Sequence, residues 1–165
     1  MKKIFCLLLF VVPFTAVMAQ SKNQQEEKPA LEQRVDSLQH ELAFLKAKYE
    51  LDQLNTEIKI NACDINTRTN SIEINMTFKN YNIALGRAYQ SNYEATEELA
   101  EKIKERADSL KLLIVLQLMK YSFSDSETEL LKSDIKTLDL GLNSLDKSLD
   151  LYKMTINEYK KQCRE

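Results

Sequence analysis

The stretch of residues 131–163, LKSDIKTLDLGLNSLDKSLDLYKMTINEYKKQC, decides the fold. Its apolar residues return at alternating steps of four and three, and lysine and aspartate fill many positions between them. A strand would need steps of two, so the spacing predicts a single apolar seam on a long helix. Such a seam must be covered by other helices or by another chain. Its members are Leu131, Ile135, Leu138, Leu142, Leu145, Leu149, Tyr152, Ile156, Tyr159 and Cys163.

The composition agrees with a helical protein. Among 165 residues there are only two glycines, two prolines and no tryptophan. A sheet protein of this size needs many tight turns, which draw on glycine and proline. The sequence therefore predicts an all-α fold, and its length requires only one domain.

Residues 1–19 have the features of a cleaved signal peptide. Lys2 and Lys3 precede an apolar run, and Val17-Met18-Ala19 suits a signal peptidase. A retained anchor is the alternative, but Pro13 interrupts the run before the roughly 20 apolar residues that a membrane span needs. We therefore expect a bacterial protein that is exported to the periplasm, the outer envelope or the medium. We expect it to contact the membrane only through the signal peptide.

The charge gives no basic surface. Cleavage would remove two lysines and no acid, which changes the formal net charge from −2 to −4. This weakly acidic balance provides no positive field for phosphates, so we expect no nucleic-acid partner.

The chain after the leader divides into an arm and a helical domain. Residues 20–29 contain no large apolar residue, which predicts a flexible arm, and residues 30–165 are predicted to form one helical-bundle domain. The start of this domain contains a first apolar seam with the same spacing as the C-terminal one. The register then shifts, and a second apolar row follows with a repeat of seven residues. The first seam comprises Leu31, Val35, Leu38, Leu42 and Leu45, and the second Phe44, Leu51, Ile58 and Ile65.

The middle of the chain leaves two arrangements open. Residues 61–82 are rich in Asn and Thr, and their apolar residues fit a helix better than a local hairpin, which has no sheet to join. Ser91-Asn92 predicts a break, and Ser126 with Glu129 predicts a capping box. The favoured arrangement is an antiparallel bundle of four helices at 30–61, 64–90, 92–121 and 125–163. The alternative is a three-helix coiled-coil hairpin, in which the first two helices merge.

Residues 110–119 are apolar on nearly every side of a helix. Such a helix either lies at the centre of the bundle or buries its second face against another molecule. The second alternative makes Leu112, Val115, Leu116 and Met119 candidate interface residues.

Two cysteines follow the predicted leader, Cys63 and Cys163. Export would favour their oxidation, so they are a candidate disulfide pair. In an up-down bundle they lie at opposite ends, and a disulfide needs Cα atoms within about 7 Å. An intermolecular bridge and two unpaired cysteines are the alternatives.

Catalytic motifs are missing from the sequence. It contains one histidine, no Glu-x-x-His pair for a di-iron bundle and no glycine-rich phosphate loop. We therefore expect no catalytic activity, no metal and no cofactor. The expected function is an interaction or scaffold module that binds a protein partner or itself. The alternative is a periplasmic carrier or holdase-type chaperone that holds an apolar ligand or client between helices.

Overall fold

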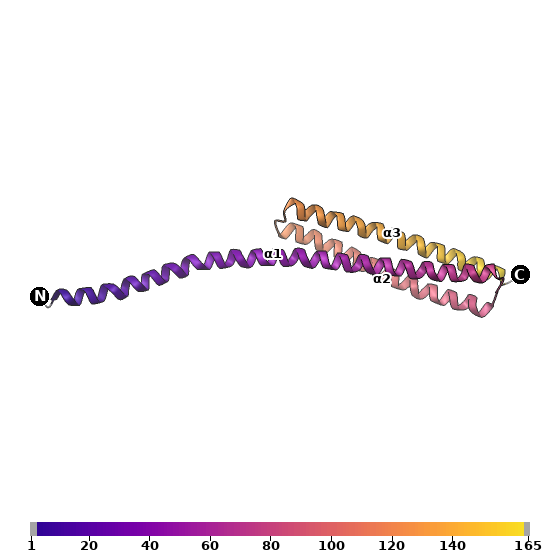
Figure 1. Ribbon diagram of the computed structural model, residues 1–165, viewed down its shortest axis with the longest axis horizontal. Helices are drawn as coiled ribbons and strands as arrows, with labels where there is room; N and C mark the ends of the chain where they lie inside the picture. Colours follow the sequence, from indigo (N-terminus) through magenta and orange to yellow (C-terminus); the bar gives the residue numbers. More distant parts are fainter. Residues whose placement is uncertain (1–2, 164–165) are drawn as a thin grey trace. The chain divides into compact units, whose positions relative to one another are not determined.

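The computed structural model describes the backbone of residues 3–163 and the side chains of residues 31–163. It is an all-α protein with three long helices, α1 (Lys3–Thr77), α2 (Ile83–Lys120) and α3 (Asp125–Gln162), and the described residues contain no strand (Figure 1). The chain divides into two compact units, Met1–Ala43 and Phe44–Glu165. The predicted signal peptide and arm lie outside the described side chains and stay predictions.

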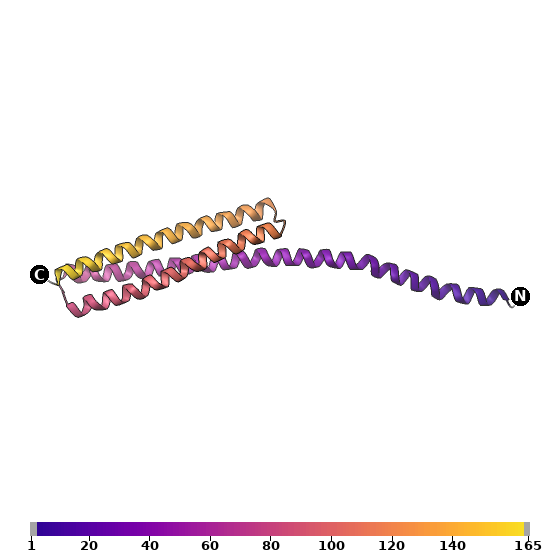
Figure 2. The ribbon, with the colours of Figure 1, turned by 180° about the vertical axis from the view of Figure 1, so that it is seen from behind.

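The second unit is a bundle of three antiparallel helices. It consists of α1 from Phe44 onwards, α2 and α3, with α2 and α3 side by side in opposite views (Figures 1 and 2). Ion pairs join α2 to α3, among them Lys104–Asp146 at 2.7 Å and Lys111–Asp139 at 2.5 Å. Both contacts raise the pKa of the lysine, because the partner carboxylate stabilises its charged form.

The C-terminal seam faces the core, as its spacing predicts. Seven of its ten members are buried, and Ile135, Leu142 and Cys163 are half-buried against the same core. From α2 the core receives Ile103, Ala107, Leu110 and Ile114. Buried Leu and Ile side chains contribute roughly 1.5–3 kcal/mol each, so these rows hold the helices together.

The register shift in α1 separates a buried row from an exposed one. Leu51, Ile58, Ile65 and Ile72 recur every seven residues, and all are buried in the second unit. The earlier seam of the same spacing has no such cover, since Leu31, Val35, Leu38, Leu42 and Leu45 are all exposed.

The predicted helix breaks at residues 61–64 and at Ser91-Asn92 are wrong, because α1 continues to Thr77 and α2 runs from Ile83 to Lys120. The Asn-rich and Thr-rich stretch stays helical since its side chains bond to the carbonyl oxygen four residues earlier. Asn61 donates to Glu57 O at 2.8 Å, and Thr69 donates to Ile65 O at 2.9 Å. Polar groups that compete with a helix in other conformations are thus satisfied inside it. The three-helix alternative is the one observed, with its break at residues 78–82.

The break itself is a Schellman motif followed by an N-cap. Lys79 has a left-handed backbone (φ 52), and Asn80 N donates to Asn75 O at 2.9 Å while Lys79 N donates to Met76 O at 3.0 Å. Asn82 then caps α2 by accepting from the backbone N–H groups of Ala84 and Leu85. The αL position of this motif usually holds glycine, and here it holds Lys79. The sequence therefore gives no signal for the end of α1.

The second loop contains a capping box, two residues earlier than predicted. Ser124, not Ser126, is the N-cap of α3, and Glu127, not Glu129, is its N3 partner. Both reciprocal bonds are present: Glu127 N donates to Ser124 Oγ at 3.2 Å, and Ser124 N donates to the Glu127 carboxylate at 2.9 Å.

Gly141 lies at a close approach of α3 to α1. A Cβ atom at this position would lie 3.2 Å from Ile58 Cγ2, closer than ordinary van der Waals contact. The missing side chain therefore lets the two helices pack closely at this level.

Among the described residues, no helix is both long and apolar enough to cross a membrane.

Candidate functional site

The last two turns of α2 expose an apolar surface, which we call the α2 patch. Its side chains are exposed by between 40 % (Leu113) and 81 % (Met119). All four predicted interface residues belong to it. The α2 patch consists of Leu112, Leu113, Val115, Leu116 and Met119.

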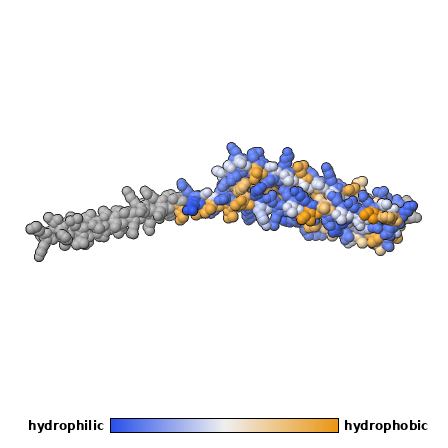
Figure 3. All heavy atoms as spheres, in the orientation of Figure 1, coloured by the Kyte–Doolittle hydropathy of each residue, from blue (hydrophilic) through white to orange (hydrophobic). Residues whose placement is uncertain are grey.

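The patch arises because residues 110–119 are apolar on more than one face of the helix, whereas only one face packs against the core. A helix packed against two neighbours buries one face, and here Leu110 and Ile114 occupy it. The intervening apolar residues then point elsewhere. Central burial of the whole segment, the other predicted alternative, is therefore not observed. Figure 3 shows apolar residues, coloured orange, among the hydrophilic ones on the visible face of the bundle.

A groove between α1 and α2 adjoins the patch, and Leu113 belongs to both. The groove has a volume of about 570 Å³, and its floor includes Leu54 and Leu110. Arg106 stands at its polar side, where its guanidinium donates to both carboxylate oxygens of Glu57 at 2.7 and 3.0 Å. The remaining lining residues are Glu50, Gln53, Glu105 and Ser109.

The opposite end of the bundle is closed by aromatic residues. The hydroxyl of Tyr159 donates to Asn80 O at 2.7 Å and accepts from Asn82 N at 2.9 Å. The rings of Tyr81 and Tyr89 lie 5.8 and 5.3 Å from the Tyr159 ring, so three tyrosines gather beside the 78–82 turn. Burial raises the pKa of Tyr159, so its hydroxyl stays protonated and keeps both bonds at neutral pH.

Tyr93 and Tyr152 extend this aromatic cluster along the bundle. Their ring centroids are 5.8 Å apart, and both side chains are buried. The hydroxyl of Tyr93 donates to the Glu97 carboxylate at 2.5 Å. Burial and the neighbouring negative charge both raise the pKa of Tyr93. These contacts are structural, because both side chains are buried in the core.

The two candidate cysteines are both free thiols and are not brought together. Cys63 is exposed on α1, and Cys163 is half-buried at the end of α3. Tyr159 places the end of α3 beside the 78–82 turn, whereas Cys63 lies 14 residues before Thr77, which is about 21 Å along a helix. That distance exceeds the span of a disulfide. A bridge between two molecules stays a prediction.

Within residues 31–163, no group of three or more His, Cys, Asp or Glu side chains is placed to hold a metal ion. Many charged residues instead form ion pairs on helix exteriors, such as Glu98–Lys102 at 2.6 Å and Asp64–Arg68 at 2.8 Å. Such exposed pairs add little to stability, because water and salt screen their charges.

Comparisons of the chain with protein-family models, with curated proteins and with solved structures find no match. The α2 patch and its groove are therefore interpreted from their own residues.

Proposed function

We propose that this chain is an exported interaction or scaffold protein of the bacterial envelope or medium, without catalytic activity, that binds a protein partner through the α2 patch. One observation carries the proposal: five neighbouring apolar side chains of α2 are exposed beside a core that does not use them. Exposed apolar clusters of this kind usually mark interaction sites, because water is a poor environment for them.

The chemistry of the patch favours a protein partner. Leucine, valine and methionine supply dispersion contacts but no hydrogen-bond donors for a small polar ligand. A flexible methionine at the end of the row adapts to partners of different shape. The expected partner therefore presents an apolar helix face or groove of its own.

A photo-crosslinking experiment tests the patch. A photoreactive amino acid replaces Leu116 in one variant and Glu101 in a matched variant, since Glu101 is also exposed on α2 but lies outside the patch. Both are produced from the complete sequence in the native host, with the leader left to be processed. We expect a discrete crosslinked product at position 116 and none at 101. Absence of a product at 116, and at 112 and 119 as well, would contradict the proposal.

The export proposal has a separate test. Cell fractionation followed by N-terminal sequencing is expected to give an envelope or secreted protein that begins at Gln20. A cytoplasmic protein that still begins at Met1 would contradict it.

The alternative function is a carrier or holdase-type chaperone. It is supported by the groove between α1 and α2, whose volume falls in the range of small-molecule sites. Retention of an apolar dye that is lost in Leu113→Asp would favour the carrier. An unchanged dye signal in that variant would remove this alternative.

A further inference from the structure

A second apolar surface lies on α1 within the first unit, and we call it the 31–42 seam. It consists of Leu31, Val35, Leu38 and Leu42, which follow steps of four, three and four. Their exposed fractions run from 44 % at Val35 to 67 % at Leu42, so no described residue covers them. This spacing is that of a coiled-coil stripe, in which the a and d positions of the heptad meet a second helix.

The heptad assignment follows from the spacing. Val35 and Leu42 occupy a positions, and Leu31 and Leu38 occupy d positions. The flanking e and g positions then hold Glu32, Arg34, Gln39 and Glu41. Residues at e and g set the partner and the orientation of a coiled coil, because they face each other across the seam.

We propose that the 31–42 seam pairs with the same segment of a second copy of this chain in the antiparallel direction. In an antiparallel coiled coil, each layer of the core pairs an a position of one helix with a d position of the other. Leu31 then packs against Leu42 of the second copy and Val35 against its Leu38. The two-fold symmetry repeats both pairs, which gives four layers. In that register Arg34 of each copy faces Glu41 of the other, and both pairs lie on the edge of the seam where g positions meet g positions. Glu32 faces Gln39, so no like charges oppose each other.

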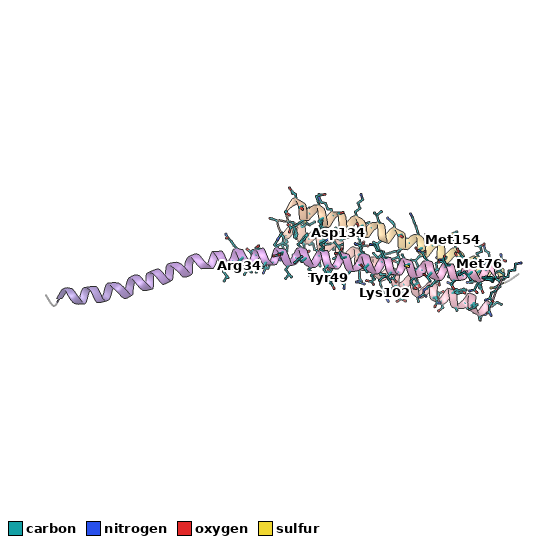
Figure 4. All side chains as sticks on the ribbon, viewed as in Figure 1. Arg34, Tyr49, Met76, Lys102, Asp134 and Met154 are labelled. Carbon is teal, nitrogen blue, oxygen red and sulfur yellow. The ribbon has the colours of Figure 1, made fainter. Side chains whose placement is uncertain are left out.

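Within residues 31–42, charge complementarity favours this direction over a parallel pair. In a parallel pair a g position faces the e position five residues later in the other copy. Arg34 would then face Gln39, and Glu41 would face Lys46 beyond the seam, so no pair of opposite charges would form between two residues of the 31–42 seam. Figure 4 shows the Arg34 side chain extending outward from α1, where a second helix can reach it. Opposite charges at such positions mainly select the partner and its orientation.

The seam has only four layers, which makes the association weak. Its Kd is expected on the order of 1–100 μM, because four short layers leave little surplus over the cost of association. The dimer is therefore reversible and depends on concentration.

Analytical ultracentrifugation tests the pairing on protein produced from the complete sequence, between about 1 and 200 μM and with reductant present. The key variant is Leu38→Lys, and Ser37→Lys is its matched control, because Ser37 is an exposed neighbour outside the seam. We expect Leu38→Lys to raise the dimer Kd at least about 100-fold, since each dimer loses two core leucines. Ser37→Lys should change it less than about threefold. Circular dichroism checks that both variants keep the helical bundle.

Charge exchange tests the direction. Arg34→Glu alone should weaken the dimer about tenfold, because two attractive pairs become repulsive. The double variant R34E/E41R should return the Kd to within about threefold of the original, since the pairs are restored with their signs reversed. A chain that is monomeric at 200 μM would overturn the proposal. So would a dimer unaffected by Leu38→Lys, a dimer lost instead in Leu116→Lys, or a double variant that fails to recover.

Discussion

The two ends of the helical bundle differ in what covers their apolar side chains. At the 78–82 turn, tyrosine rings pack on one another and the Tyr159 hydroxyl satisfies two backbone groups of the turn. At the 121–124 loop, the α2 patch leaves five apolar side chains in water. The first end buries Tyr159 among other tyrosines, although Phe78 and Ile83 beside the turn are exposed, whereas no described residue covers the α2 patch. A helical period thus identifies an apolar face but does not say which chain covers that face.

The sharpest test of this contrast compares two residues of α2 that are two positions apart. Ile114 is fully buried, and Leu116 belongs to the α2 patch. We expect Ile114→Ala to lower the free energy of unfolding by about 2–5 kcal/mol, through lost burial and a residual cavity.

The matched variant Leu116→Ala should change the free energy of unfolding by less than about 0.5 kcal/mol, because surface substitutions rarely do more. Urea unfolding followed by circular dichroism measures both. A large loss in Leu116→Ala at a concentration where the protein is monomeric would mean that the patch belongs to the core.

The closed end depends on one hydroxyl group. Tyr159→Phe keeps the ring but removes both bonds of the oxygen, so Asn80 O and Asn82 N lose their partner in a part-buried contact. We expect a loss of about 1–3 kcal/mol in urea unfolding. Tyr49→Phe is the control, because the Tyr49 hydroxyl accepts only an exposed bond from Gln53, and it should cost less than about 0.5 kcal/mol.

The same hydroxyl gives a pH test. Because the pKa of Tyr159 is raised above its ordinary value of 10.0 in the folded protein, ionisation is easier in the unfolded chain. The native protein should keep this stability below pH 10 and lose it as the pH rises further. Tyr159→Phe should lose less over that range, and an identical pH profile for the two proteins would contradict the assignment.

The other end depends on its capping box. Ser124→Ala removes the side-chain bond to Glu127 N and should cost about 1 kcal/mol of stability. Ser126→Ala changes the position that the sequence pattern favoured and should leave thermal unfolding unchanged. The reverse result would place the start of α3 two residues later.

The smallest expected effect is a gain at the closed end. Lys79→Gly relieves the left-handed backbone at the end of α1 and should stabilise the protein by about 0.5–1 kcal/mol. Lys79→Ala removes the same side chain without freeing the backbone, so it should give no gain. Equal stabilisation by both variants would show that the lysine charge, not its φ angle, was unfavourable.

Sequence reasoning succeeded where burial follows a period and failed where single side chains set a boundary. The C-terminal seam and the repeat of Leu51, Ile58 and Ile65 were predictable, because each core face needs an apolar residue every three or four positions. The stop at Lys79 was not predictable, since its αL residue is not a glycine. The sequence also did not decide whether the α2 patch is buried or exposed, because periodicity alone does not reveal which of two apolar faces meets the core.

The contact between Tyr159 and the 78–82 turn also has a consequence for folding during synthesis. The Tyr159 hydroxyl bonds to Asn80, 79 residues earlier in the chain. At roughly 5–20 residues per second, a ribosome needs about 4–16 s to make the chain between these two residues. Helical domains rich in local contacts fold in microseconds to milliseconds. This interval is thousands of times longer than the folding time. During it, the buried row of α1 lacks α3 as a packing partner and stays accessible to other molecules that contact the growing chain.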